Sequence, residues 1–299
     1  MSRFIVVAPG SSEAAALATD ELARALGVAT VDALAGTTAT DAALRPASAL
    51  PAAVEAVRAA GDDALIAPAR EASNRAFDHV AWNLNLAAST RAGVVLAFDA
   101  EGASAELLTE EIAAARLRAE AAAASVVAVV LTGGAPALEA DVPVLTLPLG
   151  EDAAATLRAA ATPTAVTPLA FQADLIERAR ADRKRIVLPE PDDDRVLQAA
   201  AQVLAAGIAD ITFVGDADYV AKRAGELGLD LSAAQVVSVG DPAYLERYAE
   251  EFARLRAKKG VTLEQAREKV TDVSYFGTCL LYTSPSPRDM RRSRMPSSA

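Results

Sequence analysis

Short runs of β-branched and other apolar residues alternate along the chain with longer stretches rich in alanine and leucine. The runs have the length of buried strands, and the longer stretches have the spacing of amphipathic helices. This alternation is typical of an α/β protein with a mostly parallel sheet. In the first part of the chain it predicts a helix over Glu13–Leu26, closed by Gly27, and strands at Phe4–Val7, Ala64–Ala67, Gly93–Phe98, Val126–Leu131 and Val142–Leu147.

A second block of the same rhythm begins at Thr167, after a stretch over 151–166 that we interpret as a short helix and a linker. Its first helix, Pro168–Asp182, starts on a proline and carries four apolar residues on one face: Phe171, Leu175, Ile176 and Ala179. The later strands are predicted at Ile186–Leu188, Ile211–Val214 and Val236–Val239, and the later helices at Arg195–Ala206, Ala217–Leu227, Pro242–Lys259 and Leu263–Val270. We therefore expect residues 1–150 and 167–278 to form separate domains.

The composition is typical of a folded protein without a membrane-spanning segment. The chain has 299 residues, of which 52% are hydrophobic and 23% charged, enough for two domains with buried cores. The longest apolar runs are far shorter than the roughly 20 residues of a membrane-spanning helix. The first residues lead directly into a strand and lack the features of a signal peptide. We expect a cytoplasmic location and no membrane partner.

Metal and nucleic-acid chemistry are not indicated. One cysteine, Cys279, and one histidine, His79, leave too few ligands for the usual zinc sites, and no serine or cysteine motif accompanies the histidine. We interpret His79 as structural and expect no metal. The net charge of −11 argues against a nucleic-acid partner, because phosphate backbones require a surplus of lysine and arginine.

The last segment, 279–299, differs from the rest of the chain, since it is basic and rich in serine and proline. Cys279–Asp289 and Arg291–Ala299 resemble a translated sequencing adapter with its flanking primer site. We expect a non-native, disordered tail on a truncated reading frame. The alternative is a native disordered basic terminus, which the composition also fits.

Five motifs in the second block are similar to those of phosphate acetyltransferases, in the order and spacing of that family. They are Leu175–Arg180, Arg185–Glu190, Gly207–Asp210, Leu255–Gly260 and Ser274–Thr278. The resemblance covers 167–278 almost completely, and it implies that this region is the N-terminal part of a three-layer α/β phosphate acetyl/butyryl transferase domain.

Basic residues near the expected strand ends are the candidate ligand-binding groups. Loops after parallel strands gather at one edge, where ligands bind, and arginine holds phosphate oxygens with paired donors. The resemblance implies that Arg256 binds coenzyme A and that Arg195 lies near that site, with Lys258 and Lys259 adding charge. The simpler alternatives are surface pairs of Arg195 with Asp192 or Asp193 and of Arg256 with Glu250 or Glu251. Two positions depart from the family pattern: Pro191 stands where glycine is usual, and Lys258 where histidine is frequent.

The family exchanges an acetyl group between coenzyme A and phosphate. The resemblance therefore implies acetyl-coenzyme A, phosphate and acetyl phosphate as substrates, no permanently bound cofactor, and a homo-oligomer in the full-length enzyme. It places an acid/base aspartate and a stabilising arginine and serine beyond Thr278. Because a site without these groups loses most of its rate, we expect this chain to be inactive. A phosphate butyryltransferase-like enzyme and a non-catalytic binding or assembly module remain the alternatives.

The first block resembles the P-loop-like domain of long forms of this enzyme, especially over Phe77–Gly102. A working phosphate loop needs a second glycine and a lysine. The loop that begins at Gly10 and leads into the helix has neither. We expect it to be a strand–turn–helix that packs without binding a nucleotide. The further regulatory domain of long forms is expected to be absent or compressed between Gly134 and Thr167.

Overall fold

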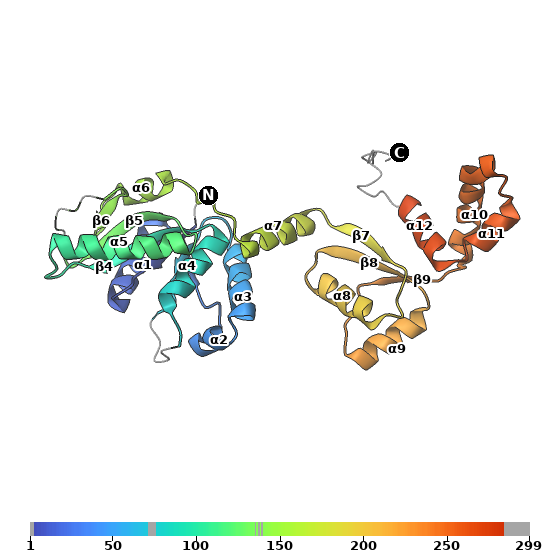
Figure 1. Ribbon diagram of the computed structural model, residues 1–299, viewed down its shortest axis with the longest axis horizontal. Coiled ribbons are helices and arrows are strands. Elements are labelled where there is room, and N and C mark those ends of the chain that lie inside the picture. The colour runs from blue at the N-terminus through green and yellow to red at the C-terminus, as the bar shows by residue number, and fades with distance from the viewer. Residues whose placement is uncertain (1–2, 71–75, 135, 137, 139, 284–299) are drawn as a thin grey trace. The chain divides into compact units, whose positions relative to one another are not determined.

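The computed structural model describes residues 3–70, 76–134, 136, 138 and 140–283 (Figure 1). The chain divides into two units, Met1–Asp174 and Leu175–Ala299, so that the boundary lies inside one helix. Each unit is built on a parallel sheet, which confirms the predicted α/β class. Within the described residues, no helix has the length and apolar character needed to cross a membrane.

The first unit contains six parallel strands in the order β2-β3-β1-β4-β5-β6. The strands are β1 Phe4–Val7, β2 Thr30–Asp32, β3 Leu65–Ala67, β4 Gly93–Asp99, β5 Val126–Thr132 and β6 Val144–Thr146. The helices of this part are α1 Ser12–Leu26, α2 Ala39–Leu44, α3 Pro46–Ala59, α4 His79–Thr90, α5 Ala105–Ala121, α6 Ala153–Ala159 and α7 Pro168–Ala181.

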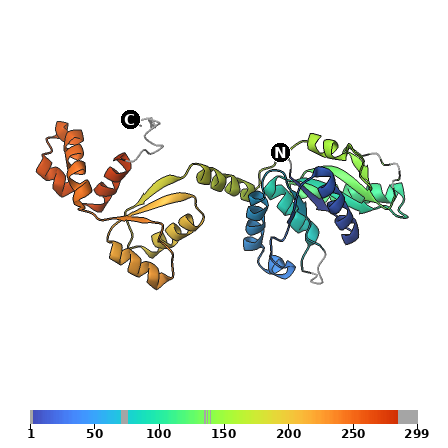
Figure 2. The same cartoon turned by 180° about the vertical axis from the view of Figure 1, so that it is seen from behind.

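Helices cover both faces of this sheet. Because successive residues of a strand point to opposite sides, neighbouring residues of β1 pack with different helices. On one face, Phe4 and Val6 pack with residues of α1 and α6. On the other face, Ile5 and Val7 pack with residues of α3, α4 and α5 (Figures 1 and 2). Every residue of β1 is buried, as expected for a central strand of a doubly covered parallel sheet.

The second unit contains three parallel strands in the order β7-β8-β9. They are β7 Lys184–Leu188, β8 Ala209–Val214 and β9 Gln235–Val237. The helices are α8 Asp194–Ala205, α9 Ala217–Leu227, α10 Pro242–Arg256, the 3-10 turn η1 Ala257–Lys259, α11 Leu263–Lys269 and α12 Val273–Thr283. α11 begins with a capping box, in which the side chains of Thr262 and Gln265 each accept a hydrogen bond from the other's backbone N–H.

The two faces of this smaller sheet carry different helices. Ile211 and Phe213 pack with α8 and α9. Val214, the next residue of β8, packs on the opposite face with α10, α11 and α12, around Tyr248 and Phe276. The end of β7 contributes to both layers, because Val187 packs with the second of these clusters and Leu188 with the first. The segment 189–194, which follows β7 and which we call the acidic loop, therefore starts between two apolar layers.

At the two ends of the second block the structure differs from the prediction. On the proposed apolar face of α7, Phe171 is 56% and Leu175 48% accessible, and Ile176 and Ala179 are half-buried. Ala170, on another face, is fully buried. Ala173, on the same face as Ala170, packs against the core cluster of the first unit. At the other end, α12 continues to Thr283, five residues into the segment expected to be disordered, because Leu280 packs against the α10 layer. Residues 284–299 lie outside the described residues.

Candidate functional site

The loop after β7 and the loop after β8 meet at the carboxyl edge of the smaller sheet. Pro191 in the first loop is buried, and its ring lies against Gly215 in the second. A Cβ atom on Gly215 would come within 2.7 Å of the Pro191 Cγ atom. Pro191, one of the two residues that depart from the family pattern, is thus part of the packing that holds these two loops together.

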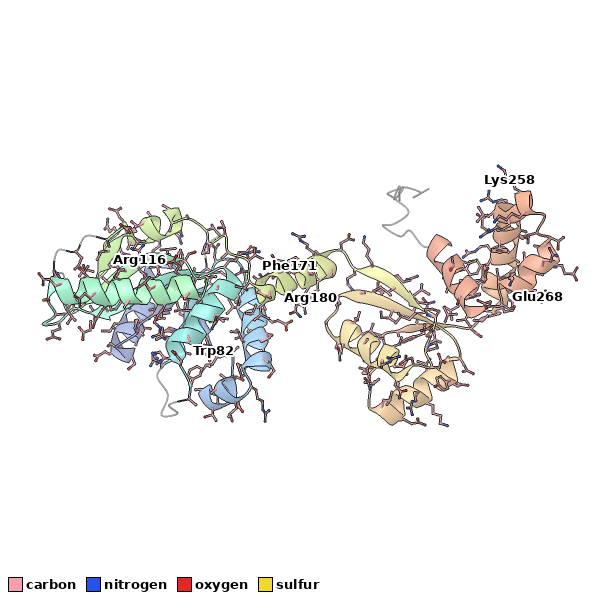
Figure 3. All side chains as sticks on the ribbon, viewed as in Figure 1. Trp82, Arg116, Phe171, Arg180, Lys258 and Glu268 are labelled. Carbon is pink, nitrogen blue, oxygen red and sulfur yellow. The ribbon has the colours of Figure 1, made fainter. Side chains whose placement is uncertain are left out.

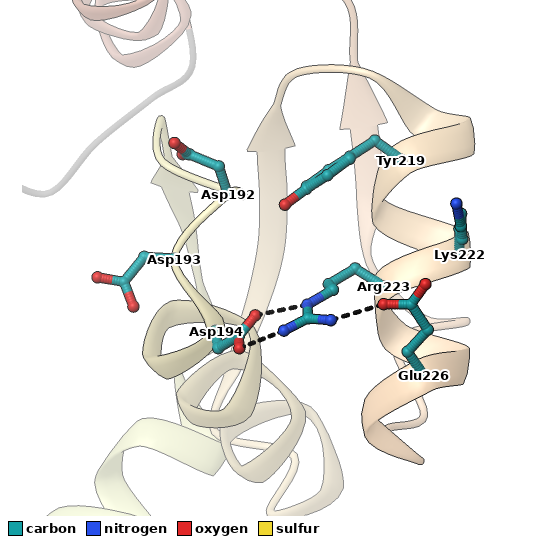
Figure 4. Close-up of a pocket in the computed structure, with 7 residues that line it drawn as sticks. All are labelled: Asp192, Asp193, Asp194, Tyr219, Lys222, Arg223 and Glu226. Carbon is teal, nitrogen blue, oxygen red and sulfur yellow. Dashed lines mark hydrogen bonds and ion pairs between the residues drawn. The ribbon is translucent and has the colours of Figure 1, made fainter.

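Beside these loops is an open depression of about 700 Å³. It is lined by the acidic loop and one side of α9, with Asp192, Asp193, Asp194, Tyr219, Lys222, Arg223 and Glu226 (Figure 4). Four carboxylates against two cations make it an unfavourable place for a phosphate. Within the described residues, no group of His, Cys, Asp and Glu side chains has a geometry that could hold a metal ion.

Arg223 ties the start of α8 to α9 (Figure 4). Its Nε and Nη2 atoms donate to the two carboxylate oxygens of Asp194 at 2.7 and 2.6 Å, and its Nη1 atom donates to Glu226 at 2.6 Å. These hydrogen bonds lower the pKa of Asp194 and raise the pKa of Arg223. The guanidinium is therefore engaged by protein carboxylates and is a structural clamp.

Arg195 also forms a protein contact, as the simpler alternative predicted. Its Nη2 atom lies 2.6 Å from the Asp193 carboxylate, and the backbone N–H of Arg195 donates to the same group at 2.8 Å. The Arg195 side-chain and backbone hydrogen bonds lower the pKa of Asp193 to about 2. The Arg195 side chain is 88% exposed, so a ligand can reach it. To bind the guanidinium, that ligand has to replace the Asp193 carboxylate.

Arg256, Lys258 and Lys259 lie together at the end of α10 and in η1, and all three are exposed. Figure 3 shows Lys258 at the tip of this segment. The alternative pairing of Arg256 with Glu250 or Glu251 is not formed among the described residues, and Glu251 accepts hydrogen bonds from Arg254 instead. Among the residues that the structure describes, these three cations form no ion pair. We call Arg256, Lys258 and Lys259 the basic end of α10.

The contact of Arg256 is with an aromatic ring. Its guanidinium carbon lies 5.8 Å from the centre of the Phe252 ring. Sequence reasoning did not single out Phe252, although its position four residues before Arg256 places both on one helix face. It also missed Arg223, whose partner Asp194 is 29 residues away in the chain and becomes a neighbour only through the strand pairing.

The loop after β1 leads directly into a capped helix. Ser11 caps α1, with its hydroxyl accepting a hydrogen bond from the Ala14 N–H. The first lysine of the chain is Lys184, so the region before it supplies none to a phosphate loop. His79 is the first residue of α4 and is partly exposed.

Residues 170–286 match the family model described as phosphate acetyl/butaryl transferase. The phosphate acetyltransferase of Corynebacterium glutamicum is 49% identical over 112 residues, 38% of this chain and 34% of the relative. That of Nitratidesulfovibrio vulgaris is 40% identical over 117 residues, 39% of this chain and 17% of the relative. Among solved structures, the EutD phosphotransacetylase from Staphylococcus aureus is 34% identical over 37% of this chain and 34% of its own, with a TM-score of 0.34.

The match covers the five motifs that the sequence indicated and stops short of the first unit's sheet. The chain spans about a third of the length of the Corynebacterium relative and less of the second. The resemblance of the second block to phosphate acetyltransferases is therefore confirmed over residues 170–286, the region that matches the family model.

Proposed function

We propose that this chain carries part of the catalytic domain of a phosphate acetyltransferase, which converts acetyl-coenzyme A and phosphate into coenzyme A and acetyl phosphate. The support is the 49% identity to a phosphate acetyltransferase over the region that holds the five motifs. Residues 1–150 would form a separate α/β domain with a degenerate phosphate loop.

The basic end of α10 is proposed to bind coenzyme A. This ligand carries three phosphate groups, and an arginine guanidinium offers them two parallel N–H donors. The observation that carries the proposal is the availability of these donors, since the basic end forms no ion pair among the described residues. Arg195 is the second candidate, and it would have to leave Asp193 to take part.

Binding of coenzyme A to the purified chain tests this proposal. Isothermal titration at low salt is expected to give saturable binding that weakens as salt is added, because the contacts are between exposed charges. Replacing Arg256 by Gln should weaken binding, and replacing Lys258 and Lys259 by Gln should reduce its salt dependence. Lys222→Gln, which removes a cation from the acidic depression, is the matched control and should have no effect. A parent chain that does not bind millimolar coenzyme A would contradict the proposal.

The isolated chain is proposed to be inactive. The thiol of coenzyme A is a weak nucleophile until a base removes its proton, and the resemblance places the aspartate, arginine and serine of the reaction beyond Thr278. An assay with acetyl phosphate and coenzyme A is therefore expected to show no turnover. Measurable turnover would overturn the inactivity but support the assignment of the reaction.

Phosphate butyryl transfer is the second candidate, because the matching family model is described for both acyl groups. Comparing acetyl and butyryl phosphate as substrates of a chain that extends over the full length of the relatives would separate the two reactions. A clear preference for the butyryl substrate would favour the second candidate.

A further inference from the structure

Aromatic side chains are concentrated in one part of a chain that contains few of them. Only 4% of the residues are aromatic. Five of these residues form an aromatic cluster on α10 and α12. Tyr244, Tyr248 and Phe276 make ring contacts with one another, and Phe252 makes one with Tyr275. The inner part of this cluster, around Tyr248 and Phe276, is buried core. The outer part, Phe252 and Tyr275, is accessible, and Tyr275 is 39% exposed.

Arg256 continues the aromatic row of α10. Tyr244, Tyr248, Phe252 and Arg256 are spaced four residues apart and therefore lie one above the other on the helix. Long side chains on a helix lean toward its N-terminus, so the Arg256 side chain reaches back over the preceding member of the row. The guanidinium consequently lies over the ring of Phe252, 5.8 Å from its centre.

The Phe252 ring is itself held from the side by α12. Tyr275 packs against it with the ring planes at 89° and the ring centres 5.7 Å apart, the edge-to-face geometry that aromatic pairs favour. On Tyr275 lies a second cation, with the Lys269 Nζ atom 5.5 Å from the ring centre. The ring under Arg256 is thus fixed by two helices.

This arrangement leaves the N–H groups at the edge of the Arg256 guanidinium available to a ligand. A ring holds a guanidinium by its flat face, whereas a phosphate is bound by the N–H groups at its edge. Arg256 therefore differs from Arg195 and Arg223, whose N–H groups are bonded to carboxylates. The aromatic support restricts the Arg256 side chain without occupying its donors.

We propose that the ring of Phe252, backed by Tyr275, positions the guanidinium of Arg256 to bind a phosphate group of coenzyme A. Phe252 and Tyr275 are positioning residues, and the inference rests on the proposed function of the basic end of α10. The ring restricts the Arg256 side chain before coenzyme A binds, so the side chain loses less conformational freedom on binding. An aliphatic residue of similar size would not restrict it in this way.

Three variants and their combination test this role in the full chain. Phe252→Leu removes the ring, Phe252→Trp keeps an aromatic face, and Arg256→Gln removes the cation. An exposed cation–ring contact corresponds to about a two- to fivefold change in an equilibrium constant. We expect Phe252→Leu to raise the dissociation constant of coenzyme A by that factor, Phe252→Trp to leave it nearly unchanged, and Phe252→Leu to add nothing in the Arg256→Gln background.

A measurement without ligand tests the contact itself. The Arg256 Nε–Hε resonance, assigned by its loss in Arg256→Lys, is expected to shift when the ring is removed and to keep a ring-induced shift in Phe252→Trp. If Phe252→Leu unfolds the second unit, Phe252→Met replaces it as the variant without a ring. Circular dichroism checks that each variant is folded.

The outcomes separate the positioning role from the proposed function. A parent chain that does not bind coenzyme A overturns both the function and the ligand-binding role of the ring. If the parent binds, equal losses from Phe252→Leu in the parent and in the Arg256→Gln background overturn the positioning role alone. An Arg256 resonance that does not move in Phe252→Leu overturns it as well.

Discussion

At the start of α8, one carboxylate both caps the helix and holds an arginine. Asp193 accepts from the Arg195 backbone N–H and from its guanidinium, and these bonds lower the pKa of Asp193 to about 2. An unperturbed aspartate has a pKa of about 3.9. Because the folded value is the lower one, the charged form stabilises the fold above pH ~4, and this contribution is lost as the pH falls from ~4 through ~2.

We therefore predict that replacing Arg195 by Gln raises the pKa of Asp193, because the hydrogen bond that lowers this pKa most comes from the Arg195 side chain. A carbon-detected NMR titration of the aspartate side chains measures this value. Asp230 is the internal control, since its pKa is lowered by Ser232 and should not respond. An Asp193 pKa of about 4 in the parent chain, the ordinary aspartate value, would show that the Arg195 contact does not persist in solution.

The contact between Pro191 and Gly215 makes a second prediction at the level of single residues. Gly215→Ala places a methyl group 2.7 Å from the proline Cγ atom, and overpacking of this kind costs about 1–3 kcal/mol. The free energy of unfolding from urea denaturation should fall accordingly. Gly225→Ala in α9 is the matched control, since a Cβ atom there meets nothing within 4 Å. It should stabilise the helix by about 0.5–1 kcal/mol.

The cause of the Gly215 effect can be tested by removing its neighbour. In a Pro191→Gly background the added methyl group has space, so Gly215→Ala should cost much less there than in the parent chain. An equal cost in both backgrounds would mean that the proline ring is not what excludes the methyl group.

Among the elements, those with strong local signals were predicted well. The predicted strand Phe4–Val7 and helix Ala217–Leu227 have the same bounds as β1 and α9. α9, for example, ends before Gly228, which adopts the left-handed conformation and so stops the helix through its own backbone. By contrast, β2 was missed because its three residues form an edge strand without an apolar run.

Where contacts between residues far apart in the chain determine the buried face or the end of a helix, the structure differs from the sequence prediction. The apolar residues of α7 suggested a buried face, but Ala170 is the residue that is fully buried. Likewise, the pattern extended α10 to Lys259, whereas the structure changes to a 3-10 turn after Arg256. At the candidate site, the pairing of Arg195 with Asp193 is local and was anticipated, while the ring under Arg256 depends on the packing of α12 on α10.

Within the first unit, the carboxylate of Asp174 in α7 pairs with an arginine of α3 and with the arginine that follows α4. Asp174 accepts from Arg58 at 2.9 Å and from Arg91 at 2.6 Å, and the Arg58 side chain is only 8% exposed. Burial raises the pKa of Asp174, but the hydrogen bonds from the two arginines outweigh it, so the net shift is downward. The charged carboxylate therefore stabilises the fold above the ordinary aspartate pKa and ceases to do so as the pH falls below it.

Replacing Asp174 by Asn should lower the free energy of unfolding by about 1–3 kcal/mol at neutral pH, because a buried arginine loses its charged partner. The variant should also lose the part of the acid sensitivity that this carboxylate causes. Urea denaturation at neutral and at acidic pH measures both effects. Asp182→Asn removes a surface pair with Lys184 and serves as the control, with little change expected. Equal effects at the two positions would contradict the anchoring role of Asp174.

At the scale of the whole chain, the two units have separate hydrophobic cores. In the first, Leu108 and Trp82 belong to the cluster on one face of the larger sheet. In the second, Phe276 is fully buried in the cluster between α12, α10 and the smaller sheet. The clusters share no residue among those that the structure describes, so a cavity in one core removes packing energy from that core alone.

Trp82 allows this independence to be measured, because it is the single tryptophan of the chain and is 7% exposed. Its fluorescence follows unfolding of the first unit, whereas circular dichroism follows the helices of both. Phe276→Ala should cost about 3–5 kcal/mol in the second unit and leave the urea midpoint of Trp82 fluorescence unchanged. Leu108→Ala, at a cost of about 2–5 kcal/mol, should move that midpoint to lower urea. If Phe276→Ala moves the Trp82 midpoint as far as Leu108→Ala does, the chain unfolds as one cooperative structure, and the second unit cannot be treated as a folding unit of its own.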